Sequence, residues 1–266
     1  MATATPVYED RRMSVGRVFH RAFSAIALNP AVILGLALVV GALPGLIFSV
    51  AFVKLGLTAQ SALQAGTLSF RALMSAMFLS SLIMFVVSAL VQGALTRATV
   101  SAAEGTRASF GESLSAALPV LLPLIGLSVL TAIGIAIGFM LLIVPGIMLM
   151  MAWSVAVPSL VVERQGVFAA FRRSAELTKG SRWKIFGLSL VLFVIYWLMS
   201  AVVGLVGLRG YSAASPEGLT AANLIGGVLV GTVFNAIWGT VQPSLYVELR
   251  EAKEGDSIES LAQVFA

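Results

Sequence analysis

One apolar stretch decides the fold: SLSAALPVLLPLIGLSVLTAIGIAIGFMLLIVPGIMLMMAWSVAVPSLVV, residues 113–162. It contains no Asp, Glu, Lys, Arg or His. A helix needs about 20 apolar residues to cross the hydrocarbon layer of a bilayer, so the stretch is long enough for two crossings. Val144-Pro145-Gly146 is a turn signal inside it and divides it into predicted spans of about 119–143 and 147–162.

Four further apolar runs lie outside this stretch, at 31–53, 72–96, 185–208 and 221–247. Only helices or closed barrels satisfy backbone groups in lipid, and runs of this length favour helices. The chain is 59% hydrophobic and 11% charged, whereas soluble domains are about 45–50% apolar and about 25% charged. We therefore predict an all-α integral membrane protein with six transmembrane helices. The membrane domain covers 14–250, between a polar tail (1–13) and a cytoplasmic C-terminal tail (251–266).

The basic residues predict the orientation of these spans. Of the 17 Lys and Arg residues, 14 lie before the first span, between the second and third, between the fourth and fifth, or after the sixth. Only Lys54, Arg71 and Arg209 lie in the other connections. Because cytoplasmic segments carry the excess of basic residues, both termini should be cytoplasmic. The first long apolar run begins at Ala31 and is too long for a signal-peptide core, so we expect no cleaved signal.

Three short segments outside the spans are amphipathic at helical spacing, namely 15–27, 109–118 and 167–179, and the second opens with a capping box of Ser109 and Glu112. Helices of this kind lie in the membrane interface with their basic residues toward lipid phosphates. The alternative is a soluble helix packed on the cytoplasmic side. Interfacial placement makes five residues candidate anionic-lipid contacts: Arg17, Arg21, Arg172, Arg173 and Lys179.

The chain contains a predicted internal repeat of flat helix, span, short external loop and span, three times over. WSVAVPSLVVE (153–163) aligns with WGTVQPSLYVE (238–248), with six of eleven positions identical. In the first unit, Val91-Gln92 and Leu95 match Val241-Gln242 and Leu245, and the flat helices align through Phe19, Phe110 and Phe171. The fold class is therefore three repeated hairpins, each preceded by an interfacial amphipathic helix.

The repeated residues are the candidate structural or partner sites: Trp153, Pro158, Glu163, Trp238, Pro243 and Glu248. Each proline removes a backbone donor and predicts a kink, which is either structural or opens a groove. An acid at a helix C-terminus opposes the helix dipole and needs a basic partner. The neighbouring candidates are Arg164, Arg172 and Arg173 for Glu163, and Arg250 and Lys253 for Glu248. The alternative is that the acids engage a cationic headgroup or a partner protein.

The chain lacks the residues that several kinds of chemistry require. The chain has no Cys and a single His, His20, and no Asp, Glu, Lys, Arg or His lies inside a predicted span. Proton relays and ion-coupled carriers usually carry such residues, and ATP-driven transport needs a Walker loop that is absent here. We therefore expect no catalytic residue, no metal and no cofactor, and a protein that is not an enzyme. The charged residues behind the net charge of +5 flank the spans, so this charge does not indicate nucleic-acid binding.

The stretch PSLVVERQGVFAAFRRSAELTKGSRW (158–183) combines a proline-bearing span that ends in Glu, an Arg-Ser flat helix, Leu-Thr-Lys-Gly and Trp183. It resembles the membrane domain attached to some bacterial glycerophosphoryl diester phosphodiesterases. The resemblance implies a six-helix protein of the bacterial cytoplasmic membrane. It does not imply the phosphodiesterase activity, which belongs to a separate soluble domain in that family; here His20-Arg21 is followed by Ala22.

These observations favour a non-catalytic multi-pass protein of the bacterial inner membrane that acts on lipids or partner proteins of the cell envelope. The alternative is a passive permease or lipid-translocating protein. Gln92, Asn235 and Gln242 are the amides well inside the spans, and a continuous polar path through them would favour the alternative. Membrane lipids and other membrane proteins are the expected partners.

Overall fold

The computed structural model describes residues 13–54, 70–209 and 221–264, and over these residues every regular element is a helix. Three hairpins of long helices alternate with three short helices. The short helices are α1 (Val15–Leu28), α6 (Phe110–Ala117) and α10 (Val167–Thr178). The capping box predicted for α6 is confirmed, since Glu112 N donates to Ser109 Oγ and Ser109 N donates to the Glu112 carboxylate.

The first hairpin joins a three-part rod to one long helix. The rod consists of α2 (Pro30–Leu36), the π-helical η1 (Ala37–Ala42) and α3 (Leu43–Lys54), and the long helix is α5 (Phe70–Ala103). The second hairpin consists of η2 (Leu118–Val120), α7 (Leu121–Leu141), α8 (Ile143–Ala152) and α9 (Ala156–Glu163). The third pairs α11 (Arg182–Arg209) with α12 (Ala221–Val264), so the predicted tail after Arg250 continues the last helix.

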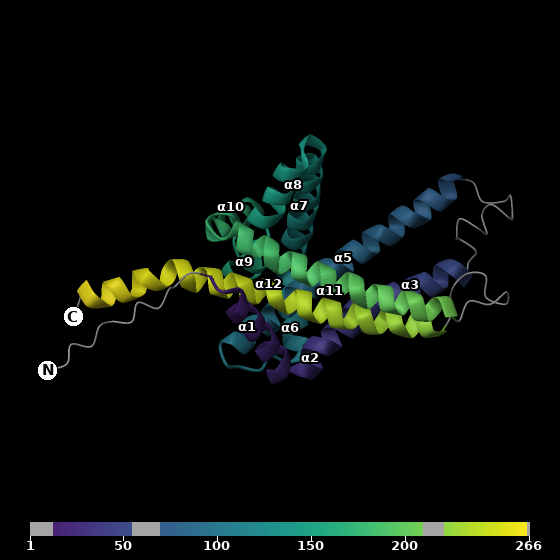
Figure 1. Ribbon diagram of the computed structural model, residues 1–266, viewed down its shortest axis with the longest axis horizontal. Coiled ribbons are helices and arrows are strands. Elements are labelled where there is room, and N and C mark those ends of the chain that lie inside the picture. The colour runs from purple at the N-terminus through teal and green to yellow at the C-terminus, as the bar shows by residue number, and fades with distance from the viewer. Residues whose placement is uncertain (1–12, 55–69, 210–220, 265–266) are drawn as a thin grey trace.

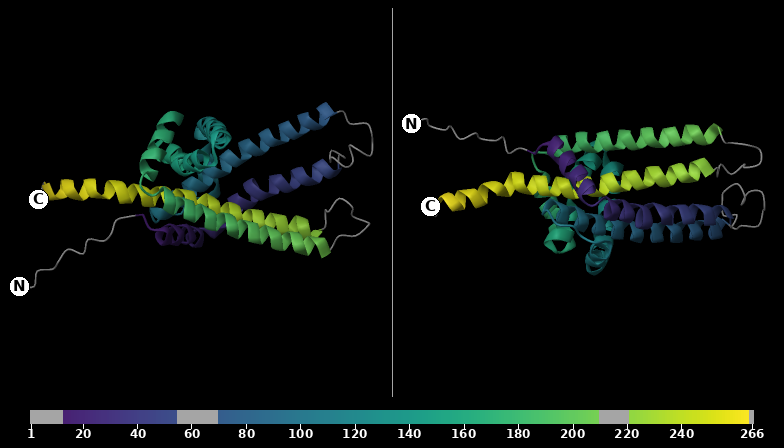
Figure 2. Two further views of the ribbon diagram at one scale, coloured as in Figure 1. Left: turned by 45° about the horizontal axis from the view of Figure 1, so that its top comes forward. Right: turned by 90° about the horizontal axis from the view of Figure 1, so that it is seen from below.

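The hairpins leave a common base in different directions. In Figure 1, α11 and α12 run along the long axis, α5 diverges from them, and α7 with α8 stands steeply across them. The short helices α1 and α10 gather with α6 and α9 where the hairpins meet (Figure 1). Figure 2 shows the same divergence from two further sides.

Six helical segments among the described residues are long and apolar enough to cross a membrane. They are Pro30–Ile47, Phe78–Ala103, Phe110–Leu141, Ile143–Glu163, Arg182–Leu205 and Leu224–Glu254. Large apolar side chains on these segments face outward, among them Phe78, Leu122 and Met140. Such a surface would be costly in water and is suited to lipid.

The turn of the second hairpin lies at Leu142, before the predicted Val144-Pro145-Gly146. Pro145 falls in the first turn of α8, where its missing N–H is no loss. Gly146 lets α8 approach α7, because a Cβ added to Gly146 would lie 2.6 Å from the Phe139 ring, and one added to Gly138 would lie 2.9 Å from the Gly146 Cα. The Pro-Gly pair therefore starts a helix and does not form the turn.

The core consists of three clusters of buried residues, each centred on one span end. Leu95, Leu160 and Leu245 occupy equivalent positions of the predicted repeat, are 1–2% exposed, and lie in different clusters. In each cluster the span end contacts the short helix that follows it in the repeat order. Ala117 of α6 joins the α5 cluster, and Ala170 of α10 joins the α9 cluster.

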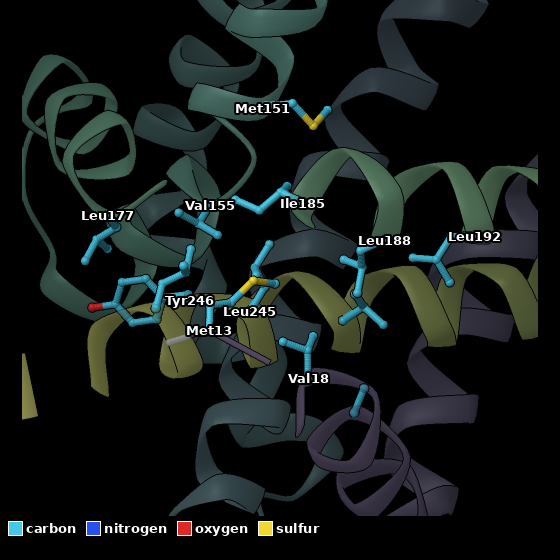
Figure 3. Close-up of a cluster of buried hydrophobic side chains, with 13 residues drawn as sticks. Met13, Val18, Met151, Val155, Leu177, Ile185, Leu188, Leu192, Leu245 and Tyr246 are labelled. Carbon is cyan, nitrogen blue, oxygen red and sulfur yellow. The ribbon is translucent and has the colours of Figure 1, made fainter. Parts of the chain in front are cut away.

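The third cluster joins the last helix of the chain to the first short helix. Val18 and Ala22 of α1 pack with Leu245 and Leu249 of α12, and Figure 3 shows Val18 and Met13 beside Leu245. The short helix α1 therefore packs against α12 in the same way that α6 packs against α5 and α10 packs against α9.

Candidate functional site: a cavity inside a ring of span ends

The span of the second hairpin breaks ahead of Pro158. Helix α8 ends at Ala152 and α9 begins at Ala156, with turns between them. The break leaves backbone groups without helical partners, and two buried hydroxyls of α10 form hydrogen bonds with them. Ser174 Oγ donates to the Ala152 carbonyl (2.8 Å) and accepts from Val155 N (3.3 Å). Thr178 Oγ1 also reaches the Ala152 carbonyl, at 3.3 Å.

Glu163 closes the end of this span, and its predicted pairing with Arg173 is confirmed. Arg173 Nε donates to Glu163 Oε1 at 2.9 Å, and Tyr246 Oη donates to the same oxygen at 2.6 Å. Gln165 Nε2 donates to the other oxygen at 2.8 Å. Burial alone would lower the pKa of Arg173, but its hydrogen bonds to Glu254 and Glu163 raise that pKa above the usual value. The acid is thus joined to α10 and α12 at once.

Glu248 has different partners from those predicted. It is 2% exposed, and its Oε1 accepts from Arg17 Nε at 2.7 Å and from Ser14 N at 3.1 Å. Arg21 Nε lies 3.6 Å from its other oxygen. The predicted partners lie elsewhere: Arg250 Nε donates to Glu254 at 2.8 Å, and Lys253 donates to the Glu176 carbonyl. The prediction was wrong because it considered only basic residues close in sequence, whereas α1 meets α12 through the tertiary fold.

The predicted lipid contacts divide into two groups. Arg17, Arg21 and Arg173 hold carboxylates of the protein itself. Arg172 is 80% exposed and lies 3.8 Å from Glu176, and Lys179 is exposed. The second group is the one available to a lipid surface.

A cavity of about 410 Å³ lies between the hairpins, within the size range of ligand pockets. Four residues of the predicted repeat line it: Trp153, Trp238, Gln92 and Gln242. Five hydroxyl side chains line it as well, from Ser88, Ser128, Thr131, Ser154 and Ser189. Phe85, Met150, Met151 and aliphatic residues complete the wall, which contains no ionisable side chain. The cavity can therefore hold an uncharged group that is partly apolar and partly hydrogen-bonding.

The two tryptophans of the predicted repeat belong to the wall of this cavity. Trp238 precedes Glu248 by ten residues on a continuous helix, which is about 15 Å at 1.5 Å per residue. Trp153 packs against Phe171, with ring centroids 4.6 Å apart, and against Gly134, where an added Cβ would lie 2.5 Å from the indole. The Gly134 and Gly138 pair therefore serves packing inside the bundle.

A smaller cavity of about 150 Å³ adjoins the first and shares Ser88 and Gln92 with it. Asn235 and Gly239 line its far side. The three amides singled out in the sequence thus lie along two neighbouring cavities.

The sequence reasoning missed the hydroxyls that cap the break and the hydroxyls that line the cavity. Ser174 and Thr178 stand on the buried face of α10, so a polar residue among the apolar positions of an amphipathic helix was the available signal. The serines of the spans gave no comparable signal, because serine is common in packed membrane helices.

Comparison with known proteins identifies relatives of the chain. The model of a domain of unknown function, DUF7847, matches residues 13–249. A UPF0259 membrane protein of Pectobacterium carotovorum subsp. carotovorum is 29% identical over 136 residues, which is 49% of this chain. The match covers about half (52%) of that protein's own length. No solved structure matches the chain. The six candidate spans and this relative together show a multi-pass membrane protein.

The resemblance to the phosphodiesterase membrane domain is wrong, since both matches point to other families. The structure explains the error. The residues that carried the resemblance cap a helix break and pair a span-end acid, as Ser174 and Glu163 do. These are packing roles and are not specific to one family.

Proposed function

The chain belongs to the family of the domain of unknown function DUF7847, and we propose that it is a non-catalytic lipid-binding protein of the bacterial cytoplasmic membrane. The central cavity carries the proposal. It combines amide, hydroxyl and indole groups with apolar walls and has no ionisable side chain in its lining. The glycerol and ester region of a lipid has matching chemistry, with hydrogen-bond acceptors between apolar chains. Unpaired amides in hydrocarbon are costly, so an occupant that accepts hydrogen bonds is favoured.

The basic-residue bias supports an orientation with both termini cytoplasmic. In this orientation the charged ends of α9 and α12 face the cytoplasm, and the short helices lie in the interface. The cyclic packing of α1, α6 and α10 on successive span ends supports a threefold repeat of hairpins. Exposed Phe23, Phe168 and Trp183 on or beside these short helices suit insertion among lipid headgroups.

A cavity-filling substitution tests the lipid-binding function. Ala132 lines the cavity, whereas its neighbour Ile133 is exposed on the same helix and does not line it. The full chain in nanodiscs containing a photoactivatable diacylglycerol should crosslink at residues of the cavity wall. Ala132→Phe should reduce that crosslinking several-fold, while Ile133→Phe should leave it unchanged. Equal crosslinking in the parent and both variants would contradict the proposal.

The second candidate function is passive lipid translocation or permeation. The observation that favours it is the pair of adjoining cavities that share Ser88 and Gln92 and include Asn235 and Gln242. In proteoliposomes, a fluorescent lipid should then exchange between leaflets faster than in protein-free vesicles, and Gln92→Leu should slow the exchange. Lipid exchange at the protein-free rate, together with diacylglycerol crosslinking, would support lipid binding without translocation.

A further inference from the structure

Three arginines from separate parts of the chain line one pocket beside α6. They are Arg97 of α5, Arg107 of the connection between α5 and α6, and Arg164 directly after α9. The pocket measures about 700 Å³. Among the described residues, none of these three arginines lies within ion-pair distance of a carboxylate, in contrast to Arg17, Arg21 and Arg173.

Two carboxylates also line this pocket. The Glu112 carboxylate is held by Ser109 N at 2.7 Å in the capping box of α6, and Glu104 is exposed. The three guanidinium groups therefore leave an excess of positive charge. The hydroxyls of Ser101, Thr106 and Ser115 also belong to the lining.

One acid of the predicted repeat is missing at this junction. Glu163 and Glu248 each stand three residues after the buried leucines Leu160 and Leu245, and each holds arginines of the adjoining short helix. Three residues after the equivalent Leu95 the chain has Ala98, which is buried and carries no charge. The junction of α5 with α6 thus lacks the span-end acid of the other two junctions. The position of α6 aligned with Arg21 and Arg173 is Glu112, so the arginines of this pocket come from α5, from the connection after it and from the end of α9.

The backbone at Arg164 has a conformation that favours glycine. Arg164 has φ of 49°, and among the described residues it is the non-glycine residue with positive φ. It ends α9 in the left-handed conformation, where glycine is the unstrained choice. Replacement of Arg164 by glycine would therefore remove the guanidinium group without straining the backbone.

The surroundings show how a ligand could approach. Pro119 lines the pocket, and its neighbours Leu118 and Leu122 are 55% and 79% exposed. The charged pocket therefore opens next to an apolar surface at the start of the third span. This arrangement suits an anionic headgroup whose acyl chains follow α7.

We propose that this pocket binds a phosphate group, carried by a phospholipid headgroup or by a free phosphate. Arginine forks donate paired hydrogen bonds to phosphate oxygens, and three of them match a tetrahedral anion. The site is separate from the central cavity, so either proposal can fail without the other.

The test measures thermal unfolding of the full chain in detergent against increasing phosphatidic acid, with diacylglycerol as the lipid that lacks phosphate. Phosphatidic acid should raise the unfolding temperature in a saturable manner, and diacylglycerol should not produce this arginine-dependent shift. Arg97→Gln, Arg107→Gln and Arg164→Gly should each weaken the apparent affinity roughly tenfold. Arg250→Gln, a half-exposed arginine outside the pocket, is the matched control and should bind as the parent does.

Arg164→Gly separates a binding role from a structural one. Glycine relieves the positive φ, so the unliganded variant should melt at or above the parent temperature while its affinity falls. Inorganic phosphate provides the second arm. If it produces the same saturable shift, the ligand is a free phosphate, and if only the lipid does, it is a headgroup. The proposal is overturned if the pocket variants bind phosphatidic acid like the parent or like Arg250→Gln.

Discussion

The spans that end in Glu163 and in Glu248 share Trp, Pro, Ser, Leu, Val and Glu at equal spacing, yet only one of them breaks. The first is interrupted at residues 153–155, ahead of Pro158. The second continues through Pro243 as part of α12. The difference matches the neighbouring helix. The break is capped by Ser174 of α10, whereas the aligned position of α1 is Ala22, which has no hydroxyl to offer.

A proline in a span therefore does not by itself determine the local backbone. It removes one donor, and the helix then breaks where a neighbour satisfies the freed groups and bends or continues where no neighbour does. In the continuous span, the hydroxyls of Thr240 and Ser244 bond to carbonyls one turn back, at 2.8 Å and 2.7 Å. Two segments that share six of eleven residues thus adopt different backbone structures.

Replacement of Glu163 or Glu248 should have the largest effect on stability, and the two losses should differ. Glu248 is 2% exposed and holds two arginines, whereas Glu163 is 22% exposed. Glu248→Gln leaves Arg17 and Arg21 without their shared charge partner and should cost about 3 kcal/mol, the lower end for buried pairs since Arg17 is half-exposed. Glu163→Gln keeps an acceptor for Tyr246 and should cost about 1 kcal/mol. Denaturant unfolding in detergent micelles would measure both, and equal losses would contradict the inequality.

Removal of the cap should have the next largest effect. Ser174→Ala leaves the Ala152 carbonyl and the Val155 N–H with fewer partners in a buried site and should cost about 2 kcal/mol. The matched change, Ala22→Ser, adds a hydroxyl where no break needs it and should not stabilise the protein. Amide hydrogen exchange at Val155 should rise in Ser174→Ala. If the cap is dispensable, exchange and stability will both stay at the parent values.

Replacement of the prolines should have the smallest effect on stability. This effect should be a gain, whereas replacement of the acids causes a loss. Pro243→Ala restores a donor inside a continuous helix and should stabilise the protein by about 1 kcal/mol. Pro158 lies in the first turn of α9, where its donor is not needed, so Pro158→Ala should change stability by less than about 0.5 kcal/mol. Similar gains in both variants would mean that the break does not depend on the local capping described above.

Charge and hydropathy were sufficient to predict the helical class and six candidate spans, because a span is a local property of about 20 residues. The capping box of Ser109 and Glu112 and the pair of Glu163 with Arg173 were also predictable, since their members are three and ten residues apart. The partners of Glu248 were not predictable in this manner. Arg17 lies 231 residues away, and only the packing of α1 on α12 brings the two together. The turn at Leu142 was misplaced for a similar reason, because the role of Gly146 depends on contact with Gly138.

The pairing of Glu248 with Arg17 and Arg21 also affects the timing of biogenesis. A chain made at about 5–20 residues per second needs roughly 10–50 s to add the 231 residues between Arg17 and its partner. Throughout that interval the first helix has basic side chains whose final acid does not yet exist. The nascent protein must therefore keep α1 at the membrane surface until its last helix arrives, and a truncated product lacking α12 would retain an unmatched basic helix by which it differs from the finished one.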